Sequence, residues 1–224
     1  MFREGVISIA ALIFLGGAAT ACESQQGKVV FEDNFADDSG GWGVSGSSGV
    51  GKKEYSEIKN NTLIMRPNLN AKDDQVVYHS WLSAFSLNDG DYCVEFSLPP
   101  APAADNNVAA GLMIWLKDND NFYMVLVFTN KDIGLFKQLD GKWDNLFYLE
   151  SNPSVKVEKD SVNSLRAVAK DGKLTFFVNG VQVKAMRAQP PEGDSHFGVY
   201  AQVRKPTDAD TTVVFKNFKV TRGQ

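Results

Sequence analysis

Residues 164–187 read SLRAVAKDGKLTFFVNGVQVKAMR, and this stretch decides the fold class. Apolar and polar residues alternate on both sides of Asp171-Gly172 and again on both sides of Asn179-Gly180. Alternation with a period of two predicts half-buried strands. Asp-Gly and Asn-Gly are favoured pairs for two-residue hairpin turns, which need positive φ. The stretch therefore predicts a three-stranded antiparallel meander.

The same signals continue along most of the chain. Short β-rich runs alternate with turn residues, and no helical periodicity appears after the N-terminal segment. About a dozen antiparallel strands in about 200 residues predict an all-β fold, a two-sheet antiparallel β-sandwich. The further strands are predicted at residues 29–35, 62–66, 75–79, 91–98, 108–116, 121–129, 133–139, 143–149, 197–203 and 213–221.

Composition excludes several classes of protein to which the chain could belong. The chain has 224 residues, 43% hydrophobic residues and a formal net charge of −4. This composition is ordinary for a globular protein. The chain is also long enough to bury a core without metals or many disulfides. A nucleic-acid-binding protein is expected to carry a basic face, so we expect no nucleic-acid partner. The two cysteines exclude a disulfide-rich scaffold and a four-cysteine zinc site.

The N-terminus has the pattern of an export signal. Arg3 precedes an apolar run at residues 6–15, in which Ser8 is the single polar residue, and the small residues Ala19 and Ala21 follow. These are the charged, apolar and cleavage regions of a secretory signal peptide. The apolar run is shorter than the ~20 residues that span a bilayer. We therefore expect a signal peptide at 1–21 and an exported mature chain that begins at Cys22.

Residues 19–22 also resemble a bacterial lipobox, which implies lipidation of Cys22. In that interpretation Cys22 is the only membrane attachment and the protein is anchored in the bacterial cell envelope, at the outer membrane or cell surface. Residues 22–27 are then a short tether before a single domain at 28–224, and Cys93 is a lone thiol. If Cys22 carries no lipid, the protein is periplasmic or secreted, and a Cys22–Cys93 disulfide becomes possible.

Several motifs resemble successive strands of concanavalin A-like, laminin-G-like jelly rolls. They are FEDNFADDSGGWG (31–43), LMIWLKDNDNFYMVLVF (112–128), IGLFKQLDGKW (133–143), LRAVAKDGKLTFFVNGVQV (165–183) and VVFKNFKVTR (213–222). The resemblance implies a jelly-roll sandwich. That fold includes lectins, carbohydrate-binding modules, glycoside hydrolases and adhesion domains, so it implies no single activity. FKNFKV (215–220) and the early GW also resemble bacterial domains associated with 3-keto-glycoside hydrolysis.

A glycosidase needs two carboxylates that converge on one bond, about 5–9.5 Å apart. Jelly-roll glucanases carry them on one strand as Glu-x-Asp-x-Glu, and this motif is absent. The nearest pair is Asp91 and Glu95, which four residues of extended strand separate by about 13 Å. We interpret them as charges on the solvent face of a strand and expect no catalytic residues.

Metal and cofactor signals are also weak. Residues 118–121, DNDN, resemble part of a calcium loop but lack the glycine and glutamate that complete an EF-hand. In some jelly rolls an Asp of the last strand holds a second calcium, and the corresponding position here is Lys216. A positive charge there disfavours a cation. We predict no metal and no cofactor, and calcium remains the alternative.

The remaining signal is aromatic. Sugars present flat C–H faces that stack on rings, and their hydroxyls need polar partners. Strict alternation places Trp115 opposite Leu112, Ile114 and Leu116, on a face that would line a groove. The hypothesis is a non-catalytic glycan-binding domain whose partner is a glycan or polysaccharide; the alternatives are a glycoside-processing enzyme and a structural or adhesion module with a protein partner. The candidate groove residues are Trp115, Tyr123, Lys137, Trp143, Tyr200, Gln202 and Arg204.

Overall fold

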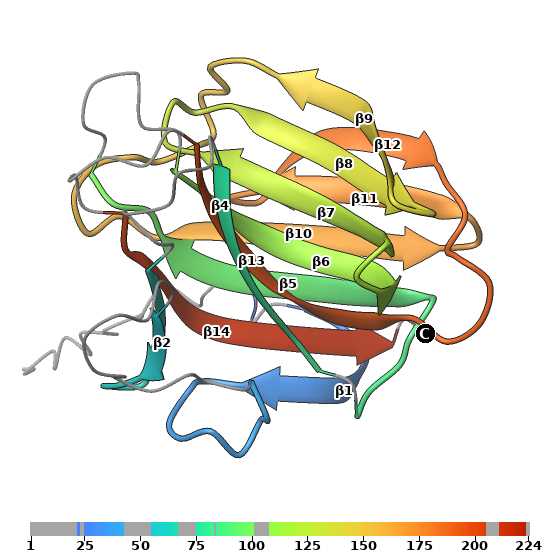
Figure 1. Ribbon diagram of the computed structural model, residues 1–224, viewed down its shortest axis with the longest axis horizontal. Helices are drawn as coiled ribbons and strands as arrows, with labels where there is room; N and C mark the ends of the chain where they lie inside the picture. Colours follow the sequence, from blue (N-terminus) through green and yellow to red (C-terminus); the bar gives the residue numbers. More distant parts are fainter. Residues whose placement is uncertain are drawn as a thin grey trace, which may run out of the picture.

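The 164–187 stretch forms three consecutive antiparallel strands in the computed structural model (Figure 1). They are β10 (Asn163–Lys170), β11 (Lys173–Val178) and β12 (Val181–Arg187). Asp171 and Gly172 have φ of 51° and 68°, and Asn179 and Gly180 have φ of 50° and 80°. Two successive positive φ values are those of a type I′ hairpin turn. The predicted meander is confirmed.

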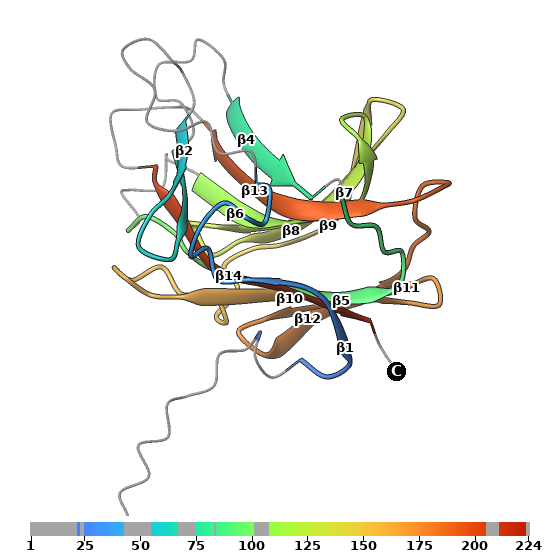
Figure 2. The ribbon, with the colours of Figure 1, turned by 90° about the horizontal axis from the view of Figure 1, so that it is seen from below.

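The structure describes residues 22, 25–42, 55–66, 75–82, 84–100, 108–204 and 211–222. Their strands form two antiparallel sheets, which lie face to face in Figure 2. The eight-stranded sheet has the spatial order β12, β11, β10, β5 (Gly90–Ser97), β14 (Val213–Arg222), β3 (Leu63–Arg66), β2 (Tyr55–Ile58), and β1 (Lys28–Asp33) also pairs with β14. The six-stranded sheet has the order β4 (Gln75–Trp81), β13 (His196–Arg204), β6 (Val108–Asp118), β7 (Asn121–Phe128), β8 (Ile133–Leu139), β9 (Lys142–Leu149). The all-β, two-sheet prediction is confirmed.

The core lies between the two sheets. On β5, Tyr92, Val94 and Phe96 point inward and are fully buried, as alternation requires. Phe197 of β13 and Phe218 of β14 stack across the interface, with ring centroids 5.9 Å apart. Among the described residues, no helix is long and apolar enough to cross a membrane.

A β-bulge changes the direction of side chains in β6. The register between β6 and β7 shifts after Ile114, and Trp115 has a φ of 50°. An extra residue in a strand, with left-handed backbone, turns consecutive side chains to the same face. Ile114 and Trp115 therefore both enter the core, and Leu116 points to the opposite face of the sheet. The prediction that Trp115 lies opposite Ile114 is wrong for this reason.

Replacing Gly180 by alanine tests the β11–β12 turn. A Cβ at this position would meet no atom within 4 Å, so the change adds backbone strain without a clash. An L-residue in the left-handed region loses about 1–2 kcal/mol. We expect Gly180→Ala to lower the free energy of unfolding by about that amount in urea denaturation. An unchanged or higher stability would show that the turn is not type I′ in solution.

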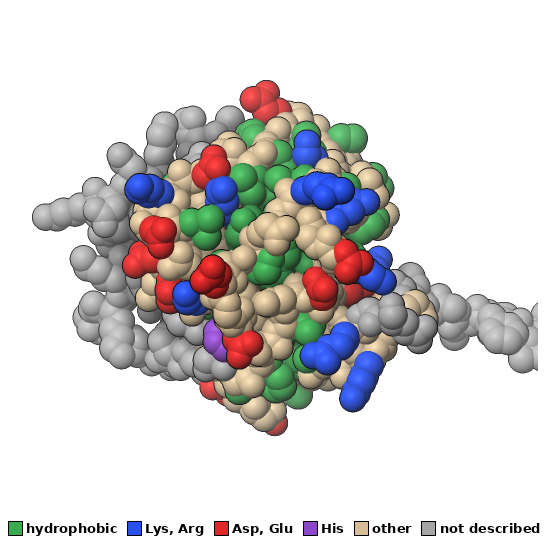
Figure 3. Space-filling model, turned by 90° about the vertical axis from the view of Figure 1, so that its right-hand side faces the viewer, with side chains coloured by type: hydrophobic (Ala, Val, Ile, Leu, Met, Phe, Trp, Pro, Cys, Tyr) green, Lys and Arg blue, Asp and Glu red, His purple; other side chains and the backbone are tan. Residues whose placement is uncertain are grey.

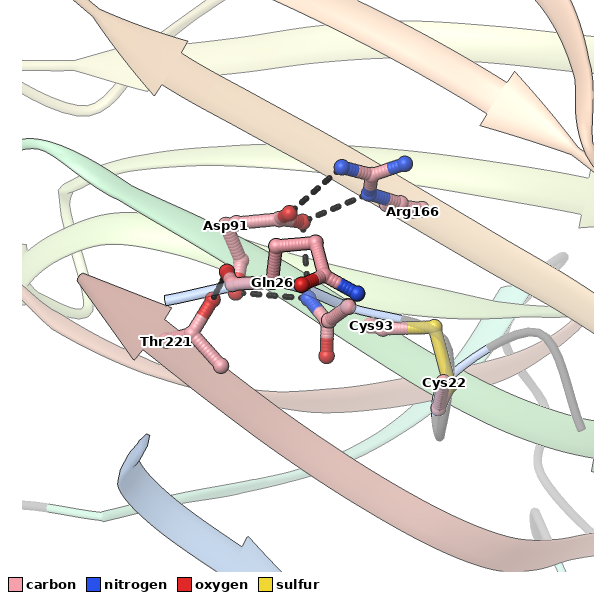
Figure 4. A network of polar contacts seen from close by, with 7 residues as sticks. Cys22, Gln26, Asp91, Cys93, Arg166 and Thr221 are labelled. Atoms are coloured by element: carbon pink, nitrogen blue, oxygen red, sulfur yellow. Dashed lines mark hydrogen bonds and ion pairs between the residues drawn. A yellow bond between two sulfur atoms is a disulfide. The ribbon is translucent and has the colours of Figure 1, made fainter. Parts of the chain in front are cut away.

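Cys22 is covalently linked to the outer face of the eight-stranded sheet. Its sulfur forms a disulfide with Cys93 of β5, across 71 residues of chain (Figure 4). Its backbone N–H donates a hydrogen bond of 3.3 Å to Glu95. A sulfur in a disulfide cannot also carry a lipid, so the structure has the Cys22–Cys93 pairing that the sequence left open as the alternative to lipidation.

The residues after Cys22 also contact the sheet. The Gln25 side chain donates to the Asp91 carboxylate at 2.7 Å, and Arg166 donates to both oxygens of that carboxylate at 2.8 and 2.6 Å. Thr221 donates to the Gln26 carbonyl at 3.0 Å. The described part of the predicted tether therefore lies on the sheet rather than free of it.

Candidate functional site

The six-stranded sheet has a second apolar face, directed away from the core. In Figure 2 this sheet is curved, and its concave side faces away from the eight-stranded sheet. Side chains that alternate with the core residues form a separate cluster on this side. Its buried members are Ala109, Met113, Leu116, Phe122, Met124, Leu126, Phe128 and Tyr200, with Phe136 and Tyr148 packed against them. A strand that is apolar on both faces, as β7 is, explains the run FYMVLVF.

At the β7–β9 end of this face the cluster reaches the surface. Phe122, Gln138 and Trp143 are cross-strand neighbours on β7, β8 and β9, and Phe136 and Asn145 form the next pair. We call these five residues the Trp143 patch. The Trp143 ring packs edge-on against Phe122, with centroids 5.5 Å apart. Trp143 is nevertheless 54% exposed, so much of this residue is accessible to a ligand.

The patch combines the two chemical features that a sugar requires. An exposed indole offers an apolar, polarisable surface, which is unusual because large aromatic residues ordinarily bury most of their area. Gln138 and Asn145 provide amides that both donate and accept hydrogen bonds. Asn145 is exposed and Gln138 is half-buried, so both can reach a bound hydroxyl-rich ligand.

Tyr200 and Gln202 lie further along the concave side, on β13. Both are buried, and the Tyr200 hydroxyl donates to the Gln202 side-chain oxygen at 3.4 Å. Val199, Ala201 and Val203, which alternate with them, lie in the inter-sheet core. The side chain of Arg204, also a candidate groove residue, lies outside the described part of the structure.

Trp115 and Tyr123 do not face the concave side, contrary to prediction. Both belong to the inter-sheet core, where their rings meet edge-to-face at 5.2 Å. The Trp115 indole donates to the Asn88 carbonyl at 2.6 Å, and the Tyr123 hydroxyl donates to the Gln189 carbonyl at 3.0 Å. Burial, with a smaller effect of the nearby Asp144, raises the pKa of Tyr123. These are structural contacts that hold loops against the core.

Lys137 is also directed away from the concave side. It pairs in register with Tyr123 and lies beside it at the edge of the sandwich. Its ammonium is 3.4 Å from the Asp144 carboxylate. Of the seven predicted groove residues, the structure therefore places Trp143, Tyr200 and Gln202 on the concave side.

Sequence reasoning missed the neighbours of Trp143. Phe122 and Phe136 were expected as ordinary strand residues, and Gln138 and Asn145 were not singled out. A signal was present, since residues 121–128 and 133–139 are joined to 142–149 through short turns that bring them side by side. The register between the strands was needed to show which residues are neighbours.

Asp91 and Glu95 lie on the opposite side of the molecule, on the outer face of β5. They are buried rather than solvent-facing, because Cys22 and Gln25 contact them. Glu95 accepts hydrogen bonds from the Cys22 backbone and from Asn217 at 2.7 Å. The hydrogen bond to Asp91 raises the pKa of Arg166. Both carboxylates thus have structural partners.

The DNDN turn is closed by its own hydrogen bonds. Asp118 accepts from the Asn121 side chain and from the Asp120 N–H, each at 2.9 Å. These hydrogen bonds, that of Asn121 first, lower the pKa of Asp118. Within the described ranges, no group of three or more His, Cys, Asp or Glu side chains could hold a metal ion.

A cavity of about 630 Å³ lies beside β1 and the loop that follows it. Asp33 and Asp37 line it together with Lys219. The Asp33 carboxylate already accepts hydrogen bonds from the Trp42 indole at 2.8 Å and the Phe35 N–H at 2.7 Å. The aromatic residues that line this cavity, Phe31 and Phe218, are buried, so the cavity offers no exposed ring for stacking. The Trp143 patch is therefore the better candidate site.

Comparison with known proteins identifies the fold. No family model matches the chain, and no curated protein matches its sequence. Among solved structures, carbohydrate-binding module CBM66 from Bacillus subtilis matches with a TM-score of 0.52 and 18% identity, over 80% of this chain and 96% of that one. The Bacillus licheniformis β-glucanase matches with a TM-score of 0.59 and 10% identity, over 89% and 100%.

The fold is that of a concanavalin A-like jelly roll. A third solved structure agrees: the catalytic domain of an endo-1,3-β-glucanase (laminarinase) from Thermotoga petrophila matches with a TM-score of 0.54 and 11% identity, over 87% of this chain and 97% of that one. The jelly-roll architecture implied by the sequence motifs is thereby confirmed. Because the concave sheet of this jelly roll carries the Trp143 patch, that patch lies on the main curved surface of the fold.

Proposed function

We propose that the chain is a non-catalytic carbohydrate-binding domain of an exported bacterial protein, and that the Trp143 patch is where the glycan binds. One observation carries the proposal: the half-exposed Trp143 indole lies on the concave side between amide side chains. A sugar ring stacked on the indole would bury its apolar face, while Gln138 and Asn145 would bond to its hydroxyls. The carbohydrate-binding module and the glucanases among the fold neighbours support a glycan as the partner.

A catalytic role has less support. Among the described strand residues of the six-stranded sheet, no Asp or Glu side chain faces the concave side. One carboxylate reaches this side from a turn: Asp132, between β7 and β8, is buried and accepts a hydrogen bond from the Tyr148 hydroxyl. Asp91 and Glu95 are on the other sheet and are held by Arg166, Asn217 and the N-terminal segment. Glycoside hydrolysis by two carboxylates requires both at one substrate bond. Binding without bond cleavage needs only the features that the patch has.

Export is the second element of the proposal. The apolar run at residues 6–15 has the pattern of a secretory signal. Disulfides persist in oxidising compartments, so the Cys22–Cys93 bond supports a location outside the cytoplasm. Because the same bond occupies Cys22, we propose the periplasmic or secreted alternative rather than a lipid anchor.

Trp143→Ala tests the site. In affinity electrophoresis through gels that contain soluble β-1,3-glucan, mixed-linkage β-glucan or galactan, we expect at least one polysaccharide to retard the wild-type chain. The alanine variant should lose about tenfold or more in affinity, because removal of a central aromatic contact typically weakens binding by 2 kcal/mol or more. Val181→Ala is the matched control, since Val181 is equally exposed, at 55%, but lies on β12 of the other sheet.

Two results would contradict the proposal in different ways. If a broad panel of polysaccharides fails to retard the wild-type chain, glycan binding itself is wrong. If a polysaccharide retards Trp143→Ala as strongly as wild type, the ligand binds elsewhere and the assignment of the patch is wrong.

A further inference from the structure

A pocket separate from the Trp143 patch opens at one end of the sandwich, between the two sheets. It has a volume of about 360 Å³, within the range of roughly 300–1,000 Å³ typical of small-molecule sites. Strands β8 and β9 form one wall, and the end of β12 with the loop after it forms the other. Figure 3 looks at this end and shows hydrophobic atoms between groups of Lys and Arg side chains.

The floor of the pocket is apolar. Leu139, Leu146 and Met186 line it, and each packs against the inter-sheet core while remaining partly accessible. Pro190 and Pro191 continue this surface on the loop. An accessible apolar floor of this kind favours a ligand with a flat or compact apolar face.

Two cations lie at the rim. Lys137 comes from β8 and Arg187 from the end of β12, so the two sheets each contribute one positive charge to the same pocket. Arg187 is exposed and has no ion-pair partner within the described ranges. Within the part of the chain that the structure describes, Lys137 forms its ion pair with Asp144, whose side chain is 56% exposed, and ion pairs open to solvent are weak. On a chain of net charge −4, this pair of cations is a local reversal of sign.

The loop wall of the pocket is held in place. The Tyr123 hydroxyl donates to the Gln189 carbonyl at 3.0 Å, and the Ala188 N–H donates to the Gly172 carbonyl at 3.1 Å. These bonds connect the loop to β7 and to the β10–β11 turn. A ligand therefore does not have to order this wall when it binds, which removes part of the entropic cost of association.

We propose that this pocket binds a sugar that carries a carboxylate, such as a hexuronate residue of an acidic glycan. The carboxylate lies between Lys137 and Arg187, where the planar guanidinium gives a two-pronged hydrogen bond. The apolar face of the ring rests on Leu139, Leu146 and Met186. The Gln189 side chain lies at the rim and bonds to hydroxyls.

A sugar acid fits this pocket better than a fatty acid does. Drug-sized or acyl ligands usually bury 70–90% of their surface in an enclosed site. This pocket is open to solvent along one side, and exposed polar side chains form much of its rim. It can cover one face of a ring and leave hydroxyls in water, but it has no closed channel for an alkyl chain.

The experiment is isothermal titration of the full mature chain with a galacturonate trisaccharide and with the matched neutral galactose trisaccharide, at low salt. We expect the acidic sugar to bind at least about tenfold more tightly. Arg187→Gln should weaken its binding about tenfold, because hydrogen bonds to charged groups contribute about 1.5–3 kcal/mol and 1.4 kcal/mol corresponds to a factor of ten. Lys59→Gln is the matched control: it removes the same charge from an exposed turn outside the pocket.

A second variant, Asp144→Asn, is expected to strengthen binding of the acidic sugar rather than weaken it. It removes the competing partner of Lys137 and a like charge near the bound carboxylate, so the acidic sugar should bind about two- to fivefold more tightly. A merely structural role for Lys137 and Asp144 would not produce tighter binding.

The proposal is overturned if the galacturonate trisaccharide shows no binding at millimolar concentration, if the neutral sugar binds Trp143→Ala as tightly as the acidic sugar does, or if Arg187→Gln behaves like Lys59→Gln. Trp143→Ala separates this pocket from the concave side, because it should leave uronate binding unchanged. Failure of neutral glycan binding at the Trp143 patch and failure of uronate binding here are therefore independent results.

Discussion

Replacing both Cys22 and Cys93 by serine is expected to lower the free energy of unfolding by about 4 kcal/mol. The disulfide joins residues 71 positions apart, with Cα atoms 5.4 Å from each other. Closing a loop of this length removes conformational entropy from the unfolded chain, and the chain-entropy relation gives a value near 4 kcal/mol at 25 °C. The variant also loosens the residues that cover Asp91 and Glu95, which adds to the loss.

Urea denaturation of wild type, reduced wild type and the double serine variant measures this effect. Reduced wild type and the variant should unfold at similar, lower urea concentrations, and reductant should not change the variant. Intact mass of the exported wild-type chain provides the chemical control: it should correspond to a disulfide and to no acyl group. A lipid mass on Cys22, or equal stability with and without reductant, would contradict the pairing.

Replacing Trp115 by alanine is expected to have an effect of similar size but on stability alone. Trp115 is 1% exposed, packs edge-to-face on Tyr123 and donates its indole N–H to Asn88. Truncation of a buried tryptophan typically lowers stability by about 3–5 kcal/mol. Because the side chain lies between the sheets, the folded variant should bind glycan with wild-type affinity.

Trp143→Ala is expected to have the opposite pattern of effects on stability and on glycan binding. Trp143→Ala removes a half-exposed ring and should change stability by less than about 1 kcal/mol while it weakens glycan binding. Trp115→Phe keeps most of the buried volume and remains available if Trp115→Ala is too unstable to purify. Urea denaturation and affinity electrophoresis on all three variants decide the matter, and weaker glycan binding by stable, folded Trp115→Phe would contradict the core position of Trp115.

The hairpins could be predicted from the sequence because their information is local. Asp171-Gly172 and Asn179-Gly180 favour positive φ, and the alternating residues on either side then determine which face each residue occupies. Trp143 follows the same pattern immediately after the Asp140-Gly141 turn. The structure places it on the outer side of the six-stranded sheet, next to Phe122.

The predictions failed where one extra residue, or a contact with a distant part of the chain, changes the orientation or the burial of a side chain. At Trp115 a single bulge residue reverses the alternation, and no local pattern in GLMIWL indicates it. Asp91 looked like a solvent-facing charge because its neighbours on β5 alternate regularly. Gln25, 66 residues earlier in the chain, covers it. Strand β2 was missed because the four residues YSEI have no clear period of their own; its position is set by pairing with β3.

The most direct test of glycan binding at the Trp143 patch is a titration of ¹⁵N-labelled protein with a retarding polysaccharide fragment, followed through the tryptophan indole N–H signals. Trp143→Phe assigns the Trp143 signal by its disappearance. Trp42 and Trp115 are internal references, since their indoles are buried and bonded to Asp33 and Asn88. We predict a saturable shift of the Trp143 signal while these two stay in place. Saturable binding that leaves the Trp143 signal unshifted would contradict the account.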